Sequence, residues 1–345
     1  MDDKEKAIET ALKDINKKYG TNTVIQLEDT EFKIEAIPTG SLALDYVFAC
    51  GGIPRGRIIE MYGAEGSGKS TLAYFIAAQV QKQGGKVAWI DVEMAFDSDY
   101  AKKIGVEVET LYMSQPENGE QALDIVDKMA STSAIDLIVL DSVAALVPEK
   151  ELAGEFKDAE MAQTARMLAK AMRMLAGNIS KTNTVVIFIN QLREILNVTW
   201  GPKTRTPGGK ALKFFSSVRL EIRRGKLFKN GDEVIGNEMI IKAIKNKVGM
   251  PFRSASVNLF YGKGIDLNAE IFGLGVKTNL IKKIGVTYFF GDERLAVGQD
   301  ASSEYIGQHP DLAKKIRKAL TEIDLAQYDS VPNTTAVSTE EASED

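Results

Sequence analysis

The octapeptide Gly63-Ala64-Glu65-Gly66-Ser67-Gly68-Lys69-Ser70 decides the fold of this chain of 345 residues. It has the pattern G-x-x-x-x-G-K-S/T and lies between an apolar strand pattern at 57–62 and a helical pattern at 70–83. In such a loop the glycines let backbone N–H groups turn inward on phosphates, Lys69 reaches the terminal phosphates and Ser70 ligates Mg²⁺. An ordinary glycine turn would not require these flanking elements, so we predict the phosphate-binding loop of a nucleoside triphosphatase.

Strand and helix patterns alternate around this loop. Further apolar runs occupy 86–91, 136–141 and 184–190, and three more at 218–223, 238–245 and 255–261 follow without long helices between them. The alternation predicts an α/β fold, a mostly parallel twisted sheet flanked by helices, with the last three strands antiparallel at one edge.

Changes in composition predict four parts. Residues 1–35 contain a helical pattern at 3–19 but are too few to form a core, so we expect an N-terminal helix-strand arm that docks on a neighbour. Residues 36–264 form the ATPase core, and 265–328 form a small α+β C-terminal domain. Residues 329–345, rich in Ser, Thr and Glu, are predicted to be a disordered acidic tail.

Composition excludes several classes of protein. With 44% hydrophobic and 26% charged residues, no leader pattern and no apolar run of ~18 residues, the chain is expected to be soluble, cytoplasmic and without a membrane partner. One cysteine, Cys50, and one histidine, His309, leave too few ligands for a disulfide or a zinc site. The net charge of −5 is uneven, because 193–253 holds 14 Lys/Arg against 5 Asp/Glu. We expect this basic segment to bind nucleic acid.

Carboxylates follow two of the predicted strands. Asp141 ends the apolar run 137–140, where P-loop proteins place the carboxylate of the Mg²⁺ shell. Asp91 and Glu93 end another strand on one face, and either could activate the water that attacks the nucleotide. The residues alone leave that choice open.

The segment 192–210 is long and irregular, which favours a functional loop over an ordinary surface loop. It combines cations that could bind phosphates, apolar side chains that could stack on bases and glycines that permit close approach, as expected for a segment that binds single-stranded nucleic acid. These residues are Arg193, Leu196, Val198, Trp200, Gly208, Gly209 and Lys210. A weaker candidate is the loop 151–158 with the following helix, which carries Arg166 and Arg173 on one face.

The chain closely resembles the bacterial RecA recombinases across about residues 35–300. The resemblance is carried by the phosphate loop and, in family order, by SLALD at 41–45, GGIP at 51–54, IDVE at 90–93, SQP at 114–116, DSVAAL at 141–146, FINQ at 188–191, GGKALKF at 208–214 and KNK at 245–247. The resemblance implies a RecA-type P-loop ATPase core.

The resemblance also implies roles for single residues. Glu93 activates the attacking water and Gln191 senses the γ-phosphate, while Lys245 and Lys247 reach the ATP of the adjacent protomer and Phe214 links protomers. The nucleotide would be held by Gly63, Glu65, Gly66, Ser67, Gly68, Lys69, Ser70, Thr71, Asp97, Tyr100, Tyr261 and Gly262. Met161, Arg166 and Arg173 would belong to the first DNA loop.

The function implied is that of a DNA recombinase and DNA-dependent ATPase. With ATP and Mg²⁺ it would form a helical filament on single-stranded DNA, exchange strands with homologous double-stranded DNA, act in recombination and repair, and induce the SOS response through a LexA-like repressor. One alternative is a ring helicase on the same core. A DNA scaffold without ATP turnover is disfavoured because Lys69, Asp141 and Glu93 are all present.

Overall fold

The computed structural model describes residues 3–20, 23–24, 34–152, 161–195 and 204–328. Residues 1–35 form one compact unit and residues 36–345 another. The first unit contains the predicted helix, α1 (Asp3–Tyr19), whose first turn is acidic and whose last turn is basic, as the helix dipole favours. The described residues of the arm contain no strand.

A nine-stranded sheet forms the centre of the second unit, in the order β13-β12-β11-β10-β3-β7-β6-β4-β5. From β10 to β5 neighbouring strands are parallel, whereas β10, β11, β12 and β13 are antiparallel to one another in turn. The three late strands therefore lie towards one edge as predicted, and β10 also pairs in parallel with β3. The strands are β3 (Ile58–Gly63), β4 (Val87–Asp91), β5 (Tyr112–Ser114), β6 (Leu137–Asp141), β7 (Val185–Gln191), β10 (Val218–Asn230), β11 (Glu233–Asn246), β12 (Ser254–Phe260) and β13 (Gly264–Ile265).

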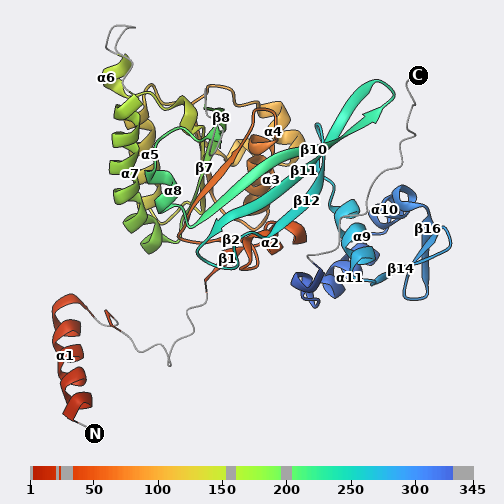
Figure 1. The fold of residues 1–345 in the computed structure, drawn as a ribbon, viewed down its shortest axis with the longest axis horizontal. Helices are drawn as coiled ribbons and strands as arrows, with labels where there is room; N and C mark the ends of the chain where they lie inside the picture. Colours follow the sequence, from red (N-terminus) through yellow and green to blue (C-terminus); the bar gives the residue numbers. More distant parts are fainter. Residues whose placement is uncertain (1–2, 21–22, 25–33, 153–160, 196–203, 329–345) are drawn as a thin grey trace. The chain divides into compact units, whose positions relative to one another are not determined.

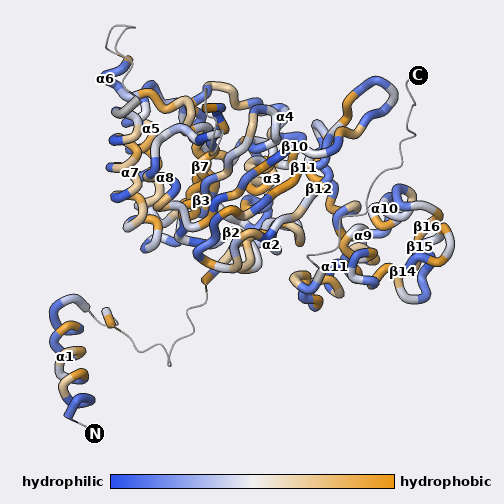
Figure 2. The backbone as a smooth tube through the Cα atoms, viewed as in Figure 1, coloured by the Kyte–Doolittle hydropathy of each residue, from blue (hydrophilic) through white to orange (hydrophobic). Residues whose placement is uncertain are grey.

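Helices cover both faces of this sheet (Figure 1). One face packs against α2 (Leu42–Phe48), α3 (Lys69–Lys82) and α4 (Ser98–Ile104), and the other against α5 (Gly119–Ser131), α7 (Met161–Thr182) and α8 (Ala211–Phe215). Every residue of β3 and β4 is buried, as expected for parallel strands between two helical layers. Figure 2 shows the hydrophobic residues concentrated along the central strands. The predicted α/β fold class is confirmed.

The short elements connect these layers. They are β1 (Ala36–Ile37) paired with β2 (Ile53–Pro54), β8 (Arg193–Glu194) paired with β9 (Thr204–Arg205), α6 (Glu149–Leu152), and the 3₁₀ turns Val108–Thr110, Val143–Ala145 and Leu325–Tyr328. Within the described part of the chain, no helix is both long and apolar enough to span a bilayer.

The small C-terminal domain is α+β, as predicted, and its apolar core also includes Leu42 of α2. It consists of α9 (Leu267–Lys277), β14 (Ile281–Ile284), β15 (Thr287–Phe290), β16 (Glu293–Val297), α10 (Gln299–Gln308) and α11 (Pro310–Thr321). Buried Glu270 of α9 accepts hydrogen bonds from the Leu42 backbone N–H, at 2.8 Å, and from the Ser41 hydroxyl. Arg317 of α11 donates to the Gly40 carbonyl oxygen at 2.7 Å. These contacts attach the small domain to the start of α2.

The register of the parallel strands brings the predicted site residues to one edge of the sheet. Gly63 of β3 pairs with Gln191 of β7, and Asp91 of β4 pairs with Asp141 of β6. Parallel strands end at the same edge, and ligands of such sheets bind outside their carboxyl ends. Four sequence-distant motifs thus meet at the loop that follows β3.

Candidate nucleotide and nucleic-acid site

The loop between β3 and α3 has the backbone that its glycines allow. Gly66 and Gly68 have φ values of 66° and 89°, in the left-handed region that glycine enters without strain. A Cβ atom on Gly63 would lie 2.1 Å from the Ile222 carbonyl oxygen, so only glycine permits this approach of β10. The helix α3 then begins at Lys69, with its N-terminus at the loop. The geometry fits an anion at the positive end of a helix.

Two polar side chains in this loop fit a phosphate group. The Ser67 hydroxyl is buried and has no hydrogen-bond partner among the described residues. The Lys69 Nζ atom donates to the Ala64 carbonyl oxygen at 2.8 Å, so the side chain folds back over the loop. Burial lowers the pKa of Lys69, although Asp141 and Glu93 oppose this effect. An anion would satisfy both groups.

Ser70 and Asp141 provide adjacent oxygen atoms beside the loop. The Ser70 hydroxyl donates to Asp141 Oδ2 at 2.7 Å. Burial raises the pKa of Asp141 to about 6, and the nearby carboxylates of Glu93 and Asp91 add to this effect. The described residues contain no cluster of three or more His, Cys, Asp or Glu that could hold a metal. The pair fits Mg²⁺, which takes oxygen ligands and leaves most of its shell to phosphate and water.

Asp91 and Glu93 have different surroundings, which bears on the choice that the sequence leaves open. The Asp91 side chain is buried and accepts hydrogen bonds from the backbone N–H of Ala95 and Phe96, at 3.2 and 3.1 Å, and from Gln115 Nε2 at 3.0 Å. Its oxygens are therefore committed to holding the loop after β4. This structural role is not visible in the sequence.

Glu93 is exposed at the carboxyl edge and can be reached by solvent. Gln191 Nε2 donates to Glu93 Oε1 at 3.0 Å, and the Ser142 hydroxyl also donates to this oxygen. The structure thus brings Glu93, Gln191 and Asp141 close to one another. Ser142 is missing from the sequence prediction, although its position directly after Asp141 could have drawn attention to it.

The residues expected around the base lie on two facing segments. Asp97 caps α4 by accepting from the Tyr100 backbone N–H at 2.9 Å, and the Tyr100 hydroxyl lies 3.2 Å from Thr71 Oγ1. Tyr261 is 45% exposed in the turn after β12. A Cβ atom on the next residue, Gly262, would lie 3.9 Å from Lys103 of α4. Tyr100 of α4 thus approaches the first turn of α3, and the turn at Gly262 approaches α4.

Lys245 and Lys247 both contact the end of α8 in the same chain. Both donate from Nζ to the Phe214 carbonyl oxygen, at 3.0 and 3.1 Å, and Lys245 also donates to the Lys213 carbonyl oxygen at 2.6 Å. Burial, with Lys247 and Arg219 nearby, lowers the pKa of Lys245 to about 8. The Phe214 side chain is 66% exposed and, with Lys247, borders a cavity of about 410 Å³. The two lysines and the Phe214 side chain therefore lie on the same surface.

The predicted DNA-binding residues fall on neighbouring elements where they are described. Arg166 and Arg173 are exposed on α7. The segment 192–210 is not irregular throughout, because Arg193 and Glu194 in β8 pair with Arg205 and Thr204 in β9. Leu196, Val198 and Trp200, the loop 153–160 and the side chain of Met161 lie outside the described residues; Lys210 is exposed just before α8.

Gly208 and Gly209 have a packing role that the sequence does not suggest. Both have left-handed φ values, 85° and 75°. A Cβ atom on Gly208 would lie 2.5 Å from Leu168 Cδ1, and one on Gly209 would lie 2.9 Å from the Ala165 Cβ. The close approach is therefore to α7, which brings the two candidate DNA segments together.

Two family models match the chain, the RecA N-terminal domain over residues 6–266 and the RecA C-terminal domain over residues 269–323. The chain belongs to the RecA family. A protein named Protein RecA from Acholeplasma laidlawii strain PG-8A is 49% identical over 316 residues, which cover 91% of this chain and 96% of that protein. Protein RecA of Methylococcus capsulatus is 46% identical, with 99% of each chain covered. Protein RecA of Bacillus subtilis is 46% identical, with 93% of each covered.

Family membership confirms the predicted function and fold. The chain is a DNA recombinase of recombination and repair and a DNA-dependent ATPase. It binds nucleotide and DNA, and it associates with copies of itself into a filament. The ring helicase and the inactive scaffold are thereby set aside.

Proposed function

We propose that the chain hydrolyses ATP with Mg²⁺ at the loop 63–70 and completes this site only in a filament on single-stranded DNA. The observation that carries the proposal is the position of Glu93. Its accessible carboxylate accepts from Gln191 at the carboxyl edge of the sheet, beside the hydrogen-bonded pair of Ser70 and Asp141. Side chains that could serve as a base, a sensor and a pair of metal ligands therefore lie near one phosphate-binding loop.

Within one copy, the loop binds and orients the triphosphate. Ser67, which now has no hydrogen-bond partner among the described residues, would donate to a phosphate oxygen. Lys69 would do so in place of its bond to the Ala64 carbonyl oxygen, and the N-terminus of α3 adds its partial positive charge. Ser70 and Asp141 would hold Mg²⁺, which neutralises charge on the phosphates. Asp97, Tyr100, Tyr261 and Gly262 would enclose the base.

Glu93 would take the proton from the attacking water, as a carboxylate within one hydrogen bond of that water can. Gln191 and Ser142 fix the carboxylate in place. Gln191 also lies at the start of the segment that leads to β8. A change in its contact with Glu93 would therefore alter the position of the candidate DNA segment. Nucleotide state would then act as a switch on DNA affinity.

A second copy would complete the site. The side chains of Lys245 and Lys247 donate to carbonyl oxygens of α8 in their own chain. In a filament they would reach the nucleotide of the adjacent copy and stabilise developing negative charge, as a cation supplied in trans does. Phe214 and the arm 1–35 would contribute to the same contact between copies.

Further proposals concern the rest of the chain. The parts would be the arm 1–35, the core 36–264, the C-terminal domain 265–328 and the acidic tail 329–345. Arg166, Arg173, Arg193 and Lys210 would contact DNA phosphates, which position a nucleic acid without reading its sequence. A cytoplasmic location and a LexA-like repressor as a partner in SOS induction fit this role.

The variant Glu93→Gln tests the proposal. We expect it to bind ATP and remain on single-stranded DNA, with ATP turnover reduced by about 10²–10⁴-fold because the general base is lost. ATPase rates with and without single-stranded DNA, together with electron microscopy of the filaments, provide the measurement. Glu117→Gln, another exposed carboxylate, is the matched control and should behave like the parent. Fast turnover in Glu93→Gln would remove Glu93 from the catalytic role.

A further inference from the structure

A charged side chain lies at the centre of the sheet, away from the phosphate loop. Glu60 of β3 is fully buried, with β7 on one side and β10 on the other. Its neighbour on the same face of β3, Ile58, belongs to the apolar core beneath α5 and α7. A buried carboxylate is strongly destabilising unless it is paired and hydrogen-bonded. Glu60 can therefore be accommodated in the sheet only because other residues pair with its carboxylate.

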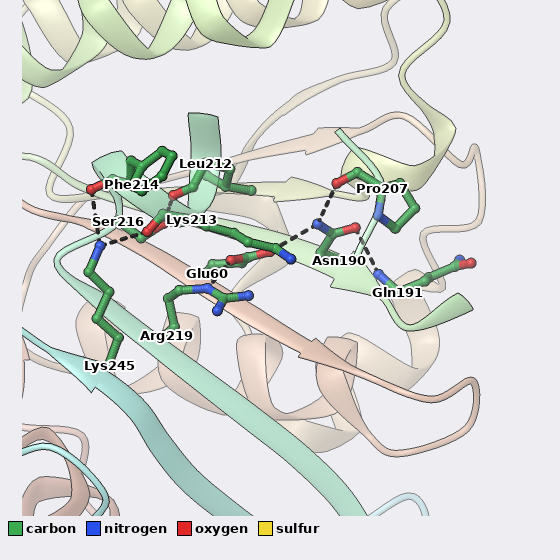
Figure 3. A network of polar contacts seen from close by, with 10 residues as sticks. All are labelled: Glu60, Asn190, Gln191, Pro207, Leu212, Lys213, Phe214, Ser216, Arg219 and Lys245. Carbon is green, nitrogen blue, oxygen red and sulfur yellow. Dashed lines mark hydrogen bonds and ion pairs between the residues drawn. The ribbon is translucent and has the colours of Figure 1, made fainter. Parts of the chain in front are cut away.

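Each oxygen of Glu60 has its own donor, and the two donors come from different strands (Figure 3). Oε2 accepts from Arg219 Nε on β10, in an ion pair whose arginine side chain is 13% exposed. Oε1 accepts from Asn190 Nδ2 on β7 at 3.0 Å. The guanidinium of Arg219 also lies over the ring of Tyr62, 4.6 Å from its centre. The carboxylate is thus a bridge across three adjacent strands.

On one side, this bridge reaches the base of the candidate DNA segment. Asn190 is fully buried, and its Nδ2 also donates to the Pro207 carbonyl oxygen at 3.2 Å. Its Oδ1 accepts from the Gln191 backbone N–H at 2.9 Å. Asn190 therefore holds both ends of the segment 191–207, including the residue that touches Glu93.

On the other side, the bridge reaches the lysine pair. Arg219 pairs with Lys245 across β10 and β11, and Lys245 bonds to the carbonyl oxygens at the end of α8. The positive charge of Arg219 lowers the pKa of Lys245, whereas the negative charge of Glu60 raises it. The protonation of Lys245 thus depends on the charges of Glu60 and Arg219 as well as on its surroundings at α8.

We propose that Glu60 is a positioning residue that couples the DNA segment, through Asn190, to Lys245 at the surface between copies, through Arg219. The inference rests on the proposed function, because it gives Lys245 a role at the nucleotide of an adjacent copy. A carboxylate with both oxygens committed cannot follow a movement of one donor without changing its bond to the other. A displacement of Pro207 by DNA therefore alters the position of Arg219, and with it the environment of Lys245.

The test measures coupling separately from stability and from binding. Glu60→Gln keeps the shape of the side chain but has one oxygen where Glu60 has two, so it retains one of the two links. We expect this variant to fold and to hydrolyse ATP without DNA at the parent rate. Its affinity for ATP in the absence of DNA, and for single-stranded DNA in the absence of ATP, should each lie within about twofold of that of the parent. The factor by which ATP tightens DNA binding, and DNA raises ATPase, should fall by about fivefold or more.

Two further variants keep the test decisive. Asp136→Asn breaks the ion pair with Arg55, which is partly exposed and lies at the opposite end of the parallel strands, so its coupling factor should match the parent. Asn190→Ala removes the hydrogen bonds to Glu60, Pro207 and Gln191 and leaves the Glu60–Arg219 pair, so it should lose coupling to a similar extent. The double variant should lose no more than either single one.

The outcomes separate this inference from the proposed function. If Glu60→Gln keeps the full coupling factor, or loses nucleotide and DNA binding in proportion to stability, Glu60 has only a structural role and the inference is wrong. If Glu60→Gln does not fold, Asn190→Ala decides between the same two results. A parent protein that shows no DNA stimulation of its ATPase would instead overturn the proposed function.

Discussion

Replacing Glu270 with glutamine should change how the stability of the protein depends on pH. This carboxyl group is buried between the core and the small C-terminal domain, where it accepts from the Leu42 backbone N–H and the Ser41 hydroxyl. Burial raises its pKa to about 7 from the ordinary 4.5, and the hydrogen bonds from Ser41 and Leu42 and the charge of Arg317 only partly oppose this. The folded state therefore favours the protonated form.

The size and sign of the effect follow from this pKa. Because the folded pKa is the higher one, the stabilisation is complete below about pH 4.5 and is lost as the pH rises through about 7. The difference between 7 and 4.5, at about 1.4 kcal/mol per pH unit, corresponds to roughly 3–4 kcal/mol. Glutamine is neutral at every pH and lacks this contribution. Relative to Glu270→Gln, the parent should lose roughly that free energy of unfolding between pH 4.5 and 8.

Urea titrations of both proteins, followed by circular dichroism at a series of pH values, measure this difference directly. Asp45, which also interacts with Arg317, is present in both proteins. Glu304→Gln, an exposed carboxylate on α10 of the same domain, is the control and should follow the parent at every pH. A parent-to-variant difference that stays constant from pH 4.5 to 8 would refute the argument that burial governs this group.

Two further predictions concern the loops and the lysine pair. Gly208→Ala should destabilise the protein by about 1–3 kcal/mol, because alanine is strained at a φ of 85° and its Cβ would lie 2.5 Å from Leu168; thermal unfolding checks this, and an unchanged midpoint would contradict it. Replacing Lys245 and Lys247 together with glutamine should reduce DNA-stimulated ATP turnover by about 10³-fold, since the cations act in trans. A fluorescent nucleotide should still bind, because the phosphate loop is untouched; normal turnover would exclude a role for these lysines.

Much of the site is visible in the sequence because its groups are close together along the chain. A phosphate loop needs a strand, a glycine turn and a helix N-terminus in immediate succession, and Asp141 and Gln191 each end an apolar strand. Parallel strands bring such ends to one edge, so the nucleotide-site neighbourhood could be predicted. The functions of these residues in hydrolysis remain predictions.

Other features depend on partners that are distant in sequence. Asp91 and Glu93 look equivalent in the sequence. In the structure, Gln115 from a different segment donates a hydrogen bond to Asp91, so the Asp91 carboxylate has a structural role. Gly208 looks like a residue for close approach to a ligand, whereas its neighbour is Leu168 of α7. Such choices are made by packing, which no local pattern contains.

The sequence by itself determined the family, the α/β class and the phosphate loop, because these rest on short-range patterns of backbone preference and hydrophobic period. Only the tertiary structure decided that Glu60 bridges Arg219 and Asn190, 159 and 130 residues away along the chain. A buried charge is tolerated only where its partners are supplied, and in this sheet neighbouring strands that are remote in sequence supply them.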